Sequence, residues 1–157
     1  MSAPLAPAME RGESNGTPGQ SGRVTTKLWP MPLIVVRDVP SSSRFYARVL
    51  DAKSGQGGEA YEQIVCDGEI VLQLHAFEVE DHHGPLADRS QPLGNGLVLW
   101  FEVADFEAAL DRVRSTEAPI VLDDVENPNA LRREIWFRDP DGYLVVLAGP
   151  SQHRPRA

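Results

Sequence analysis

One stretch decides the fold: Phe137-Arg138-Asp139-Pro140-Asp141-Gly142-Tyr143-Leu144-Val145-Val146-Leu147. A run of apolar and charged residues enters a short segment of acids, proline and glycine, and a second, more apolar run leaves it. Proline fixes φ and glycine accepts a positive φ, so the segment Asp139 to Gly142 predicts a tight turn between two strands. The stretch therefore predicts a β-hairpin in the last part of the chain.

The chain contains the same predicted order of strands and helix twice, and the hairpin ends the second copy. An apolar run that suits a buried strand precedes a helix start in both halves, and Val36-Arg37-Asp38-Val39 aligns with Val103-Ala104-Asp105-Phe106 about 67 positions later. Asp105 is the expected N-cap of the second helix. The strands predicted by composition are 33–36, 52–54, 60–66 and 70–77 in the first half, and 98–103, 120–122, 133–138 and 143–147 in the second.

Each half thus reads β-α-β-β-β, which predicts an α+β fold of two βαβββ modules. A doubly wound parallel sheet is disfavoured, because two helices are too few to cover it. We expect one domain over residues 30–150, with modules at about 31–78 and 96–149 and a linker at 79–95. The segment 1–29 is rich in Gly, Pro, Ser and Ala and predicts a disordered tail, and 151–157 predicts a short C-terminal tail.

Charge and hydropathy narrow the classes of partner. The formal net charge is −8, and no basic patch offsets the acids, which argues against nucleic acid as a partner. No apolar run approaches the ~18 residues that cross a bilayer, and the N-terminal segment has no apolar signal-peptide core. We therefore expect no membrane partner and a cytoplasmic location.

The two halves together resemble the vicinal oxygen chelate superfamily, which includes glyoxalases, bleomycin-resistance proteins and extradiol dioxygenases. The similarity rests on ordered motifs: Val36-Arg37-Asp38-Val39 with Ser42, Phe45-Tyr46 and Val49-Leu50, then Phe101-Glu102-Val103 with Asp105, then the Asp-Pro-Asp-Gly turn. The resemblance implies that the modules form a curved, barrel-like mixed sheet around a cavity. It also mildly favours a homodimer.

The same resemblance implies where a metal would be held. The four ligand positions of metal-dependent members fall at about Met31, Gln73, Val98 and Val146, and the last of these would be a glutamate. None of the four residues here is a carboxylate or an imidazole, the groups that divalent transition metals need. We therefore expect the standard metal site to be absent and no cofactor to be required.

Relocated ligands remain an alternative. His75, Glu102 and Glu134 could form a facial triad if all three converged on one point. His75 and Glu134 could also act as a catalytic acid–base pair without a metal, since histidine titrates near neutral pH. Either arrangement would make the protein an enzyme of the superfamily, such as an isomerase, a lyase or a dioxygenase-like enzyme.

The cavity face suggests binding of a small molecule. Strand alternation gives that face two indoles and a few separate polar groups, as small-molecule sites have, and the indoles could stack on an aromatic or basic ligand. Alternatively, the indoles fill the space and leave a structural or regulatory domain. The leading hypothesis is a metal-independent binding protein of the glyoxalase/bleomycin-resistance type. Its expected ligand-binding residues are Gln73, His75, Val98, Trp100, Glu102, Glu134, Trp136 and Val146.

Overall fold

The computed structural model describes residues 30–79, 85–88 and 90–151. The predicted N-terminal tail, 1–29, lies outside the described residues. The same is true of the predicted C-terminal tail apart from Ser151, and of residues 80–84 and 89 in the predicted linker. No helix in the described part of the chain is long and apolar enough to cross a membrane.

Each half folds as the sequence predicts, with one helix and four strands. The first module consists of β1 (Leu33–Val36), α1 (Val39–Leu50), β2 (Lys53–Ser54), β3 (Tyr61–Cys66) and β4 (Glu69–Ala76). The second consists of β5 (Val98–Glu102), α2 (Phe106–Arg114), β6 (Ile120–Asn127), β7 (Arg132–Arg138) and β8 (Leu144–Ala148). The strand orders are β1-β4-β3-β2 and β5-β8-β7-β6, with a parallel first pair in each sheet. The predicted α+β fold of two βαβββ modules is confirmed.

Both helices begin at an aspartate. The Asp38 carboxylate accepts a hydrogen bond from the Ser41 backbone N–H at 2.6 Å, and the Asp105 carboxylate accepts one from the Ala108 N–H at 3.0 Å. Each bond satisfies a backbone donor that has no partner within its helix. The aligned aspartates of the repeat therefore have the same structural role.

β6 departs from the expected strand boundaries. It continues to Asn127, whereas the apolar pattern predicts a strand only over 120–122. The acidic pair Asp123-Asp124 suggests a turn, and Asp124 does have a positive φ of 49°. Backbone pairing with β7 nevertheless continues to Asn127, with two register shifts. Arg114 and Arg133 pair with the two carboxylates at 2.8 and 2.7 Å.

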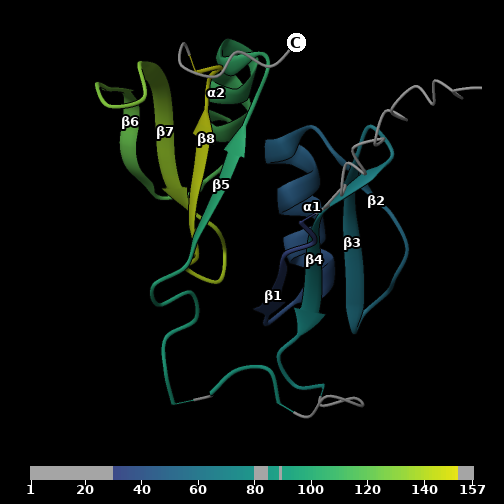
Figure 1. Ribbon diagram of the computed structural model, residues 1–157. Helices are drawn as coiled ribbons and strands as arrows, with labels where there is room; N and C mark the ends of the chain where they lie inside the picture. The colour runs from purple at the N-terminus through teal and green to yellow at the C-terminus, as the bar shows by residue number, and fades with distance from the viewer. Residues whose placement is uncertain (1–29, 80–84, 89, 152–157) are drawn as a thin grey trace, which may run out of the picture.

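The two helices and the inner faces of both sheets form one hydrophobic core. Figure 1 shows α1 between its own sheet and the second sheet, and the rings of Phe45 from α1 and Phe137 from β7 lie 6.2 Å apart. The sheets curve but do not close into one barrel. Each sheet therefore has an open face, which we define as the face that points away from the helices.

The Asp139–Gly142 turn belongs to the second module and contacts the first. Asp139 is buried, and its carboxylate accepts hydrogen bonds from the Tyr46 hydroxyl at 2.7 Å and from the backbone N–H of Tyr143 at 2.8 Å. Burial raises the pKa of Asp139 despite these bonds. Burial also raises the pKa of Tyr46, with a further contribution from the Asp139 charge. This contact is a buried polar link between α1 and the turn.

A second acid of the same turn binds the junction between β1 and α1. The Asp141 carboxylate accepts hydrogen bonds from the Arg37 backbone N–H at 3.2 Å and from its guanidinium at 3.0 Å. The Ser42 hydroxyl donates to the same carboxylate at 3.4 Å. The turn that predicts the hairpin thus also holds the two modules together.

Candidate ligand-binding face

The open face of the second sheet carries an apolar row across all four strands. In register, Trp100 lies opposite Val146, Val146 opposite Trp136, and Trp136 opposite Leu122. The two indoles meet edge to face, with ring centroids 5.2 Å apart. They leave Val146 with no exposed surface, whereas Trp100 itself is 39% exposed. The middle of the row, at Val146, is therefore covered, and the Trp100 indole beside it is partly exposed.

A charged group lies beside this row on the same face. The Arg132 guanidinium is 5.1 Å from the centroid of the Trp100 ring, in cation–π distance. It donates to Glu102 at 3.2 Å and to Glu134 at 3.4 Å. Two carboxylates thus hold one guanidinium against the indole, and the local formal charge is −1 from these three side chains.

Glu134 is the most enclosed of these charged residues and is fully used by its neighbours. It is only 2% exposed, and it accepts from the Asn127 amide at 2.7 Å and from the Trp136 indole N–H at 3.0 Å, besides Arg132. A buried carboxylate with these donors is stable as a structural group. Glu134 therefore fixes the orientation of Trp136 and Arg132.

The open face of the first sheet is polar. The Tyr61 hydroxyl donates to the side-chain oxygen Oε1 of Gln73 at 2.6 Å and accepts from the side-chain amide Nε2 of Gln63 at 3.1 Å. His75 lies in register with Tyr61 and Val35 and is 7% exposed, with its Nδ1 2.9 Å from the Ala76 carbonyl oxygen. These side chains form a hydrogen-bonded surface rather than an aromatic one.

The structure divides the predicted site residues between the two open faces. The second sheet carries six of them, namely Val98, Trp100, Glu102, Glu134, Trp136 and Val146, and the first sheet carries Gln73 and His75. Because the helices lie between the sheets, the two open faces do not meet within one chain. His75 and Glu134 are therefore not brought together in a single chain.

Sequence reasoning missed Arg132, Leu122 and Tyr61 on these faces. Arg132 lies two residues before Glu134 on one strand, so alternation alone would have placed it on the same face. Leu122 follows from the pairing of β6 with β7, which the sequence does not specify.

The residues at the projected metal positions do not fit a divalent metal. The Gln73 amide is engaged at both ends, since it also donates to the Met31 carbonyl oxygen at 3.0 Å. Val146 is an apolar side chain beneath two indoles, and Val98 offers no donor atom. Among the described residues, no group of three or more His, Cys, Asp or Glu side chains is placed to hold a metal ion.

The fold and these faces define a class of protein with paired βαβββ modules. Residues 28–147 match the Glyoxalase/Bleomycin resistance protein/Dioxygenase superfamily. The chain belongs to this superfamily, as the motifs predicted.

Solved structures with the same fold include proteins of different kinds. A structure from the mobile metagenome of V. Pseudocholerae aligns with a TM-score of 0.63 at 22% identity, covering 81% of this chain and 97% of that one. A virulence protein from Salmonella typhimurium gives 0.61 at 23%, covering 79% and 97%. A lactoylglutathione lyase from Agrobacterium tumefaciens gives 0.60 at 15%, covering 80% and 95%. No curated protein matches the sequence. At these identities, the likeness establishes the fold and no activity.

Proposed function

We propose that this protein is a metal-independent small-molecule-binding member of the superfamily, and that the open face of its second sheet is the ligand site. The observation that supports this proposal most is the position and exposure of the two indoles. They cover Val146, at the position where the resemblance implies a metal-ligating glutamate, and they leave the Trp100 ring partly exposed. An exposed indole on a fixed sheet suits stacking better than metal chemistry.

The composition of this face favours a planar ligand with a basic group. Trp100 and Trp136 offer aromatic surface, and Arg132 is paired with two carboxylates, so its charge does not oppose a basic ligand. A cationic aromatic molecule would gain both stacking and a favourable charge interaction. The acidic balance of the whole chain acts in the same direction.

A homodimer is part of this proposal. The open face of the second sheet exposes Val98, Trp100 and Leu122 by about two fifths each, at 40, 39 and 44%. Large exposed apolar side chains gathered on one face are typical of interaction surfaces. We propose that the polar open face of the first sheet in a second copy covers this face, which would enclose the ligand between two chains.

An enzymatic role for His75 and Glu134 would need that same dimer. Within one chain the two residues lie on the open faces of different sheets, so they cannot exchange a proton directly. In addition, Glu134 already accepts from three side chains. No contact favours this alternative, and binding is the better-supported function.

Titration with the planar cation proflavine, followed by calorimetry, tests the binding site. We expect saturable binding that weakens by about tenfold or more in Trp100→Ala, because stacking is lost. Ile120→Ala removes an aliphatic side chain of the same exposure, 39%, which is in register with the core residue Phe137 and not with the apolar row, and should leave the affinity unchanged. A planar anion, anthraquinone-2-sulfonate, should bind less tightly than proflavine. Equal affinities of wild type and Trp100→Ala for proflavine would refute the site.

A further inference from the structure

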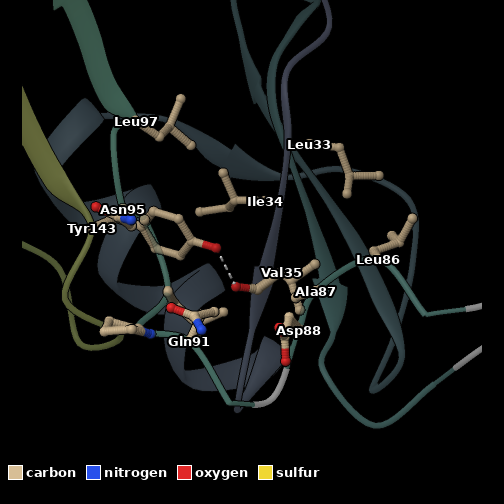
Figure 2. A pocket seen from close by; sticks show the side chains of 13 residues that line it. Leu33, Ile34, Val35, Leu86, Ala87, Asp88, Gln91, Asn95, Leu97 and Tyr143 are labelled. Carbon is tan, nitrogen blue, oxygen red and sulfur yellow. Dashed lines mark hydrogen bonds between the residues drawn. The ribbon is translucent and has the colours of Figure 1, made fainter.

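A separate cavity lies between the first sheet and the segment that connects the modules. It has a volume of about 350 Å³ and is lined by β1, by described residues of the segment 86–97, and by Tyr143 at the start of β8 (Figure 2). This volume is within the range of small-molecule sites, at its lower end. The second sheet's open face contributes none of its aromatic side chains to this cavity.

β1 presents backbone groups to this cavity. It is an edge strand, whose only neighbour in the sheet is β4. The Pro32 carbonyl oxygen accepts from the Gln73 N–H of β4, and the Val36 carbonyl oxygen accepts from the N–H of Phe77, the residue after β4. Alternation therefore turns the N–H and C=O groups of Leu33 and Val35 away from β4. The Val35 carbonyl already accepts from the Tyr143 hydroxyl at 2.8 Å, and Leu33, two residues earlier on the same edge, also lines the cavity.

The wall opposite β1 is rigid. Gly94 has a φ of +74°, and a Cβ at this position would lie 2.6 Å from the Tyr143 ring, so the connecting segment packs directly on that ring. Figure 2 shows the same tyrosine reaching across to Val35. Tyr143 therefore ties β8, the connecting segment and β1 together, and the cavity is a fixed feature of the fold.

The remaining lining is aliphatic with one charged side chain. Leu33, Leu86 and Leu97 line the cavity and are 41 to 44% exposed, so their side chains are available to an apolar ligand. Among the described residues that line the cavity, Asp88 is the one with an ionic side chain. Its Oδ1 accepts from the Ser90 N–H and hydroxyl at 2.8 and 2.7 Å, and its Oδ2 has no partner among the described residues.

We propose that this cavity is a second ligand site, which binds a small aliphatic molecule with a protonated amino group. The aliphatic part packs on the leucines, and the ammonium group donates to the Asp88 oxygen that accepts no other hydrogen bond among the described residues. A carboxylate selects a cation over an anion, because it is a negatively charged acceptor. The site uses none of the aromatic side chains on the open face of the second sheet.

Three probes with one tail and different charges test this site by NMR titration: hexylamine, hexanol and hexanoate. We expect hexylamine to give saturable shifts at the amides of Leu33, Leu86 and Leu97, with an affinity about tenfold or more above that of hexanoate. Asp88→Asn should abolish the preference for the amine and leave the weak binding of hexanol. Trp100→Ala should bind hexylamine as wild type does, although it loses proflavine.

Three results would overturn the proposal. The first is the absence of saturable shifts at the cavity amides. The second is hexylamine-induced shifts confined to the open face of the second sheet. The third is an unchanged preference for hexylamine in Asp88→Asn, which would mean that the carboxylate does not recognise the charge.

Discussion

Val146 and Asp139 lie seven positions apart around one hairpin and illustrate how differently a single residue can act. Val146 is apolar, completely covered, and flanked in register by two indoles. Asp139 is a carboxylate that is almost as deeply buried, at 4% exposed, and it is stable there because hydroxyl and backbone donors surround it. The sequence predicts the turn from proline and glycine, but it does not reveal that the acids bind the first module.

Restoring a carboxylate at Val146 should damage the protein without creating a metal site. Val146→Glu buries an ionisable group that has no donor prepared for it, and we expect a loss of roughly 3 kcal/mol in the free energy of unfolding. Val121→Glu makes the same change at a position that is 48% exposed and should cost little. Urea denaturation with and without Zn²⁺ measures both effects. Stabilisation of Val146→Glu by stoichiometric Zn²⁺ would contradict this account.

The raised pKa of Asp139 makes stability depend on pH in a definite direction. Its folded-state pKa lies above the usual 3.8 because burial disfavours the charge. The neutral acid is therefore favoured by folding, and this contribution is complete below pH 3.8 and disappears as pH rises through the folded pKa. Asp139→Asn stays neutral throughout. We expect the stability of wild type relative to Asp139→Asn to fall from about pH 3 upward and then to level off. A rise with pH in urea-denaturation midpoints would disprove the assignment.

Among the elements, β6 is the one that sequence reasoning described least well. Alternation and turn residues correctly predict the strands on either side of Asp67-Gly68 and of the Asp139–Gly142 turn, because both hairpins close locally. β6 is instead continued by its backbone pairing with β7, through two register shifts. A partner strand determines its length, so the local pattern could not predict it. The same holds for the pairing of Leu122 with Trp136.

β6 also provides the test of the proposed dimer. Leu122 extends the apolar row of the open face to the edge of the second sheet. Leu122→Glu places a charge on the surface that we expect a second copy to cover, so the mass in solution should fall from two chains to one. Val121→Glu changes the adjacent residue, which lies at the register shift between Ile120 and Leu122 and is not in register with the apolar row, and should remain dimeric. Light scattering measures both, and a monomeric wild type would refute the dimer.

On the scale of the whole molecule, the two modules are one folding unit. They share a single core, and the Asp139–Gly142 turn of the second module is bound to the first through Tyr46, Arg37 and Ser42. The sequence repeat predicts the modules and their similar topology, but the contacts between them come from residues that differ between the halves. The relative placement of the two open faces depends on those contacts and could not be predicted.

A shared core predicts that both modules unfold together. We expect the slowest-exchanging amides of β4 and β8 to report the same free energy of unfolding. Tyr46→Phe removes the buried hydrogen bond to Asp139 and should lower both values equally, by roughly 1.5–3 kcal/mol. Tyr61→Phe removes two hydrogen bonds, both within the first module and on a less buried face, so it should lower the stability of the first module without a separate effect on contacts between the modules. If Tyr46→Phe lowered the free energy of unfolding measured by hydrogen exchange in one module alone, the two modules would not be a single folding unit.

The hydroxyl of Tyr143 has a further consequence, which concerns the order of events as the chain folds. Its bond to the Val35 carbonyl spans 108 positions, and that between Tyr46 and Asp139 spans 93. During synthesis, the first module must wait for nearly all of the second before these two groups find their partners. Closing such long loops costs entropy before any contact compensates for it, which slows folding. The side of α1 that faces the second module therefore stays uncovered until the last hairpin has been made.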